Sequence, residues 1–164
     1  MGRIIRHNSS YAAQVTMQGY RNTYLIIGGA LSALAALLHV GCILFGAPWY
    51  RFFGAGERMA RMAAAGHWYP AVITSGIAAV LSCWSLYALS GAGVIRRLPL
   101  VRPALCIITG IYMLRAVAFA PFHAYFPGNS TAFWLWSSAI CFVIGLVHLV
   151  GLWRAWPRLR PAAA

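Results

Sequence analysis

Acidic residues and lysine are almost absent from this 164-residue chain, and their absence already excludes several classes of protein. Glu57 is the only acidic residue, there is no Asp or Lys, and charged residues of all kinds make up 9% of the sequence. A soluble domain typically carries about 25% charged residues, so this chain could not cover a surface that faces water. A soluble globular enzyme, a disordered chain and a nucleic-acid-binding module are therefore excluded.

Cysteine pairs with the spacing of redox or zinc motifs are also missing. The four cysteines are far apart in the sequence, and no Cys-x-x-Cys motif occurs. A thiol–disulfide redox motif and a closed zinc site therefore have no support. We interpret the thiols as small packing residues and predict no metal site. The cysteines are Cys42, Cys83, Cys106 and Cys141.

Hydrophobic residues are abundant, at 62% of the chain, and they fall into four long blocks. A transmembrane helix needs about 20 mostly apolar residues to cross a hydrocarbon layer about 30 Å thick. The blocks are too continuous for barrel strands, in which apolar and polar residues alternate. The sequence therefore predicts a single all-α membrane domain over residues 1–164, a bundle of four transmembrane helices. The predicted spans are residues 24–45, 68–89, 103–120 and 132–153.

The 13 arginines are distributed unequally between the two sides of this predicted bundle. Nine flank the spans on the side of both termini, three lie in the first loop, and one lies inside the third span. Because cytoplasmic loops carry the excess of basic residues, both termini are expected in the cytoplasm. We predict a multi-pass protein of the plasma membrane, in a bacterium the inner membrane, whose arginines meet anionic lipid headgroups and not nucleic acid.

The first loop contains a short amphipathic pattern over residues 57–65, with methionine and alanine on one face and arginine on another. These are good helix formers, and Gly66 follows them as a typical helix end. We expect a short interfacial helix that bridges the first two spans, or alternatively covers a pocket. Glu57 is expected to pair with Arg61, four residues later on the same helix.

Arg115 is the hardest residue to explain as packing, because it lies inside the third predicted span. It precedes Pro121 by six residues, roughly 9 Å along a helix. An arginine at the centre of a membrane helix costs about 2.5–3.5 kcal/mol on insertion. Arg115 therefore either extends to the headgroups beside lipid or faces the bundle interior and binds an anionic group. Tyr112 shares its helical face.

Three histidines join Arg115 in the half of the bundle away from the termini. His39 lies in the first span at nearly the depth of Arg115, His67 begins the second span, and His123 follows the third. Our working hypothesis is a ligand-binding cavity on the non-cytoplasmic side, lined by Arg115, His39, Tyr112 and His123. The alternative for His39 is a hydrogen bond between helices.

Three classes of function fit these residues. The first is a binding or accessory, transport-related protein whose polar pocket takes a lipid or a small anionic or amphipathic ligand. The second is a small membrane enzyme acting on a lipid-like substrate, with acid–base candidates His39, Glu57, His67 and His123. The third, ranked last, is a haem b electron carrier, which needs two histidines on facing helices at matching depth. No cofactor is predicted, and catalysis is left open.

The lipid bilayer is the predicted partner, and a homo-oligomer or a larger membrane complex is a second one. The second span presents small residues at helical spacing, among them Ser75, Ala79 and Ser82. Such faces pack closely in lipid, either between copies of the chain or within one copy. His148, near the end of the fourth span, is expected to form a hydrogen bond across helices.

Overall fold

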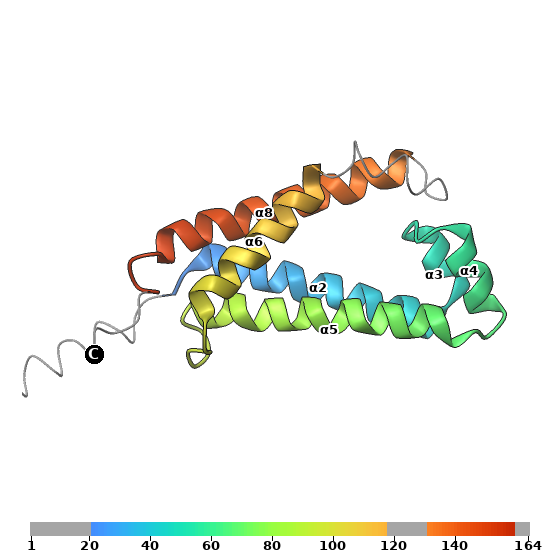
Figure 1. Ribbon diagram of the computed structural model, residues 1–164, viewed down its shortest axis with the longest axis horizontal. Coiled ribbons are helices and arrows are strands. Elements are labelled where there is room, and N and C mark those ends of the chain that lie inside the picture. Colours follow the sequence, from blue (N-terminus) through green and yellow to red (C-terminus); the bar gives the residue numbers. More distant parts are fainter. Residues whose placement is uncertain (1–20, 118–130, 160–164) are drawn as a thin grey trace, which may run out of the picture.

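The computed structural model describes residues 21–117 and 131–159, whose regular structure is entirely helical (Figure 1). The all-α prediction is therefore confirmed for these residues. His123, the end of the third predicted span and the tail before residue 21 lie outside them. The helices are α2 (Thr23–Phe45), α3 (Ala47–Phe52), α4 (Glu57–Ala64), α5 (Trp68–Gly91), α6 (Val101–Val117) and α8 (Thr131–Ala155).

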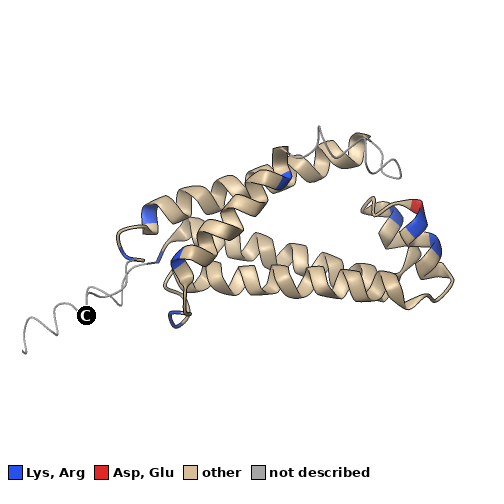
Figure 2. Ribbon diagram, viewed as in Figure 1, with Lys and Arg blue, Asp and Glu red and all other residues tan. Residues whose placement is uncertain are grey.

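Three of the described helices are long and apolar enough to span a membrane, namely α2, α5 and α8, with 23, 24 and 25 residues. At 1.5 Å per residue each is about 35 Å long or slightly more, which exceeds the thickness of the hydrocarbon layer. Figure 2 shows these helices almost free of charged residues between their ends. The protein is therefore a multi-pass membrane protein by the length and composition of its helices.

The prediction of four spanning helices is met only in part. The third predicted span corresponds to α6, of which 17 residues are described, fewer than the roughly 20 that a span requires. This helix also carries Arg102 in its first turn and Arg115 in its last, and these charges interrupt the apolar run.

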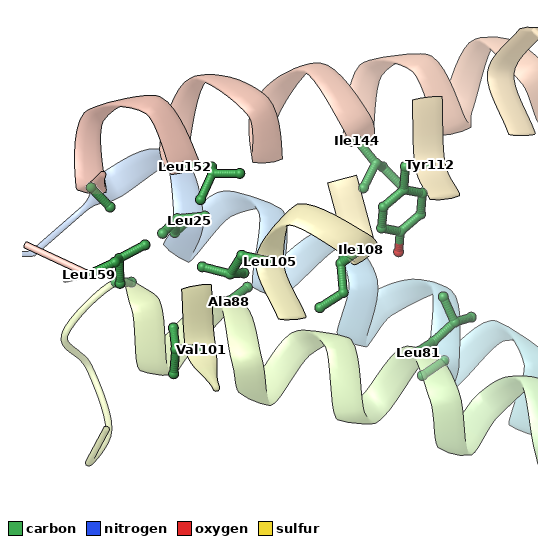
Figure 3. Close-up of a cluster of buried hydrophobic side chains, with 13 residues drawn as sticks. Leu25, Leu81, Ala88, Val101, Leu105, Ile108, Tyr112, Ile144, Leu152 and Leu159 are labelled. Carbon is green, nitrogen blue, oxygen red and sulfur yellow. The ribbon is translucent and has the colours of Figure 1, made fainter. Parts of the chain in front are cut away.

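The long helices form two pairs that are joined at one end of the molecule. α2 packs along α5, α6 crosses α8, and α8 also contacts α2. Figure 1 shows the two pairs diverging toward the end where α3 and α4 lie. Where they meet, all four helices contribute to a buried core (Figure 3). It includes Leu25 of α2, Ala88 of α5, Leu105 of α6 and Leu152 of α8.

Asn22 forms hydrogen bonds with the ends of three helices where the two pairs meet. Its side-chain oxygen accepts a hydrogen bond from the Leu25 N–H at 3.2 Å and caps α2. Its own N–H donates to the Ala92 carbonyl at 3.0 Å, just after α5, and its side-chain amide donates to the Gly151 carbonyl of α8 at 2.7 Å. We call this the Asn22 end; the start of α2 and the ends of α5 and α8 therefore share one end of the molecule.

α3 and α4 together form a small cap, residues 47–64, at the opposite end. Tyr50 of α3 is buried, and its hydroxyl lies 3.0 Å from that of Thr74 on α5. The loop at Gly54, which has a φ of +71°, contacts the ring of Phe133 at the start of α8. The short helix predicted over 57–65 is confirmed as a helix over Glu57–Ala64. Its position on a membrane surface stays a prediction.

Candidate functional site

Arg115 lies at the contact between α6 and α8 and is partly buried. Its Nη2 donates a hydrogen bond to the Ser137 hydroxyl at 2.7 Å, and its Cζ lies 4.8 Å from the centre of the Trp134 ring. Nη1 is buried and has no hydrogen-bond partner among the described residues. Among the described residues, one hydroxyl and one aromatic face thus hold the guanidinium group, and its Nη1 donors are unused.

The only acidic side chain of the protein is occupied elsewhere. Both oxygens of Glu57 accept hydrogen bonds from Arg51, from Nε and Nη2, each at 2.9 Å. This pair replaces the expected Glu57–Arg61 pair, because Gly54 and Gly56 adopt positive φ and turn α3 back against the start of α4. The Arg51 guanidinium lowers the pKa of the Glu57 carboxyl, chiefly through these hydrogen bonds. Glu57 therefore does not neutralise Arg115.

His39 is partly buried on α2 and hydrogen-bonds within its own helix. Its Nδ1 donates to the Ala35 carbonyl at 2.7 Å, so the expected hydrogen bond between helices is not formed by this nitrogen. His39 follows Ser32 by seven residues and shares its helical face, about 10 Å further from the Asn22 end. Ser32 contacts Tyr112, one turn before Arg115, so His39 and Arg115 both lie beyond this contact, on the side of the cap.

Tyr112 is part of the packed interior of the bundle. Its hydroxyl lies 2.9 Å from that of Ser32, and its ring meets Trp84 edge-on with centroids 5.0 Å apart. The centroid of the His148 ring lies 5.3 Å from that of the Tyr112 ring. Tyr112 thus joins α2, α5, α6 and α8, and its role as a ligand-binding residue stays a prediction.

His148 is a buried polar residue whose close packing against α2 the sequence did not reveal. Its side chain is fully buried on α8 and packs so tightly on α2 that a methyl group at Gly28 would lie 2.7 Å from its Cε1. Its Nδ1 donates to the Ile144 carbonyl at 2.9 Å, within the same helix and not across helices as expected. Nε2 has no hydrogen-bond partner among the described residues, and neither do the buried hydroxyls of Thr109 and Ser138.

The acid–base candidates that the structure describes do not form a catalytic pair. Glu57 is engaged by Arg51. His67 is exposed at the start of α5, where its Nδ1 accepts a hydrogen bond from the Tyr69 N–H at 3.2 Å and caps the helix. His39 bonds to its own helix, and His123 lies outside the described residues. The described residues therefore provide no acid–base pair for the hypothesis of a membrane enzyme.

The described histidines also do not meet the requirement for haem b. His148 packs on Gly28, which is eleven residues, or about 16 Å along α2, from His39. The two rings therefore lie at different depths, and His67 lies at a helix end. Within residues 21–117 and 131–159 no three His, Cys, Asp or Glu side chains gather as metal ligands would.

A cavity of about 250 Å³ lies between α5 and α6 and contains none of the residues predicted to bind a ligand. It is lined by apolar and aromatic side chains, whereas the predicted cavity was polar. The groups that the structure does bring together are Arg115 with Ser137 and Trp134, and Tyr112 with Ser32 and His148.

Comparison with known protein families, with curated proteins and with solved structures gives no match for this chain. No relative therefore supplies a residue role or an activity. Among the described residues, Arg115 is the only arginine with a buried polar atom that lacks a hydrogen-bond partner.

Proposed function

We propose that this protein binds the anionic headgroup of a membrane amphiphile and that Arg115 is the residue that holds it. The observation that carries the proposal is the environment of this side chain. Arg115 has a buried Nη1 without a hydrogen-bond partner among the described residues, and the only acidic side chain of the chain is paired with Arg51.

The energetics of a buried cation support an anionic partner. A charged group that leaves water loses several kcal/mol of hydration, which is recovered only by an opposite charge with good hydrogen bonds. Ser137 and Trp134 offer one neutral acceptor and one aromatic face, which compensate only part of this loss. A phosphate or carboxylate accepts two parallel hydrogen bonds from a guanidinium, and one of them would use Nη1, which has no partner among the described residues.

The path of the chain supports four crossings of the membrane. α5 ends at the Asn22 end, whereas α8 begins beside Gly54 of the cap at the opposite end. The chain between Gly91 and Thr131 therefore has to pass from one end of the bundle to the other. We infer that α6, of which 17 residues are described, belongs to a fourth crossing.

The arginines favour the cytoplasm as the compartment at the Asn22 end. Six of the described arginines lie near this end and three lie in the cap, and the positive-inside rule assigns the richer side to the cytoplasm. We infer that both termini are cytoplasmic and that Arg115 lies in the half of the membrane away from the cytoplasm. The plasma membrane is the inferred location, and assembly into oligomers stays a prediction.

Lipid retention during native mass spectrometry tests the role of Arg115. Protein in mild detergent is mixed with phosphatidylglycerol or with zwitterionic phosphatidylcholine, and the lipids that remain bound are counted. We expect the unmodified protein to prefer phosphatidylglycerol. Arg115→Gln should weaken this preference about tenfold or more, since a hydrogen bond to a charged group contributes about 1.5–3 kcal/mol. Arg115→Lys should keep the charge but lose the paired donors, with an intermediate result.

The matched control is Arg58→Gln, which removes an exposed arginine from the cap. This variant should retain phosphatidylglycerol like the unmodified protein. Equal retention by Arg115→Gln and Arg58→Gln would refute the proposed role, and Arg115 would then be an arginine that the headgroup region merely solvates.

A further inference from the structure

The cavity between α5 and α6 is an apolar groove on the outer surface of the bundle. It is lined by Cys83, Trp84 and Tyr87 of α5 and by Pro103, Ala104 and Ile107 of α6. Cys83, Pro103 and Ile107 are exposed, so the groove is open along the surface that faces lipid. Its position differs from that of Arg115, which contacts α8.

The chemistry of the lining selects a hydrocarbon chain as the occupant. No charged side chain lines the groove, and the phenol of Tyr87 is its most polar group. In a bilayer, hydrophobic burial does not favour one apolar surface over another, since lipid tails are as apolar as leucine. An indentation that no side chain fills loses dispersion contacts, and a flexible acyl chain restores them.

The charge near one end of the groove selects the headgroup. Leu100 also lines the groove, and Arg96 precedes it by only four residues, so their Cα atoms are at most about 14 Å apart. Ser90 fixes the Arg96 backbone, because its hydroxyl donates to the Arg96 carbonyl at 3.1 Å and accepts from the Leu98 N–H at 2.8 Å. The Arg96 side chain itself is exposed.

The loop that carries Arg96 has a strong excess of positive charge. Arg97 and Arg102 lie within six residues of Arg96, and the segment from residue 92 to 102 contains no acidic residue. Basic residues near a membrane surface attract anionic lipids. We propose that the groove holds one acyl chain of an anionic phospholipid whose headgroup phosphate contacts Arg96. This site is separate from the one at Arg115 and does not depend on it.

Filling the groove tests the acyl-chain site directly. Ala104→Trp places a large side chain in the groove, and its matched control is Gly110→Leu on the same helix, where an added Cβ meets nothing within 4 Å. In native mass spectrometry with phosphatidylglycerol, Ala104→Trp should retain one lipid fewer than its parent. Gly110→Leu should retain the same number. The loss should be equal in the unmodified and Arg115→Gln backgrounds, so a failure at Arg115 leaves this test intact.

The headgroup contact has its own variant, which leaves the groove and the helices unchanged. Arg96→Gln should weaken retention of phosphatidylglycerol about fivefold and leave retention of phosphatidylcholine unchanged, as expected for the loss of one basic residue near the membrane surface. Equal lipid counts for Ala104→Trp and its parent would overturn the site. A lower oligomeric mass for Ala104→Trp would also overturn it, since the groove would then hold a second copy of the chain. Equal loss of both lipids in Arg96→Gln would overturn the headgroup assignment.

Discussion

Close packing fixes the position of the buried His148 side chain. His148 is held between a carbonyl of its own helix and the bare backbone of Gly28. In a low-dielectric interior, a polar atom without a hydrogen-bond partner is costly, and Nε2 of His148 has none among the described residues. Gly28 is therefore needed for His148 to pack in this position, because only a residue without Cβ allows the ring to approach α2 so closely.

Gly28→Ala tests this contact. The added methyl group would lie 2.7 Å from Cε1 of a fully buried ring, so either α2 and α8 separate or the ring moves. We expect a loss of about 1–3 kcal/mol in the free energy of unfolding, as for other overpacked interiors. Thermal or detergent-induced unfolding of the solubilised protein measures it. Gly110→Ala is the control and should be neutral or stabilising by less than about 1 kcal/mol, since its surroundings are open.

A second background distinguishes this clash from a general effect on α2. In protein that already carries His148→Ala, Gly28→Ala should cost little, because the ring that the methyl group meets is gone. Two residues in contact show such coupling in a double-mutant cycle. If Gly28→Ala destabilises both backgrounds equally, the glycine acts through the helix itself and not through His148.

A single sequence reveals a charged residue inside an apolar run, but it does not reveal contacts between residues that are far apart in the chain. Arg115 was found from the sequence because a charge inside an apolar run is anomalous wherever its partners lie. The role of His148 depends on Gly28, which is 120 positions away, and no periodicity links the two. The expected pairing of Glu57 with Arg61 was wrong because helical spacing is a local rule, whereas the turn at Gly54 and Gly56 brings Arg51 closer.

Element boundaries follow from the sequence more closely than contacts do. Continuous apolar runs end where Gly, Pro or polar residues begin, so the predicted spans 24–45, 68–89 and 132–153 agree with α2, α5 and α8 to within about two residues. α3 was not predicted, because Gly46 and Pro48 indicate a break. Pro48 instead lies within the first turn of a new helix, where its missing N–H has no cost.

The exposed Arg51–Glu57 pair in the cap predicts a pH dependence. The pKa of Glu57 is lowered by Arg51, so the pair contributes fully above the ordinary pKa of a glutamate and is lost as the pH falls through the lowered value. In an NMR titration, the Arg51 Nε–H signal should shift with a midpoint below the ordinary glutamate range. Added salt should move this midpoint toward the ordinary range.

Glu57→Gln provides the control for this titration, since it keeps the shape of the side chain but removes the charge. The Arg51 signal should then lose its pH dependence in the acidic range. Because both partners are exposed, the unfolding of the whole bundle should change little in this variant. An Arg51 signal that still titrates in Glu57→Gln would show that another group, and not Glu57, causes the shift.

At the scale of the whole molecule, the topology follows from which ends meet. Asn22 binds the chain just after α5 and the last turns of α8, and Arg97 donates a hydrogen bond to the Leu159 carbonyl at 2.6 Å. The cap meets the start of α8 at the other end. The sequence could count the apolar blocks, but only these long-range contacts relate the ends of the chain to one another. They are the reason to infer that α6 belongs to a full crossing.

Single cysteines in a cysteine-free background test both the number of crossings and the orientation. Suitable exposed positions are Ala64 in the cap, Val94 in the loop after α5 and Pro157 after α8. With a maleimide that does not cross membranes, we expect Ala64→Cys to react in intact cells. Val94→Cys and Pro157→Cys should react only after permeabilisation, because both lie at the arginine-rich end.

The pattern of labelling separates the alternatives without reference to any activity. If Pro157→Cys reacts in intact cells while Val94→Cys does not, the chain crosses the membrane only three times and α6 does not span it. If Val94→Cys and Pro157→Cys react in intact cells and Ala64→Cys does not, the four crossings hold but the orientation is reversed. Arg115 would then lie in the cytoplasmic half, where anionic lipids are enriched, and the proposed headgroup would come from that leaflet.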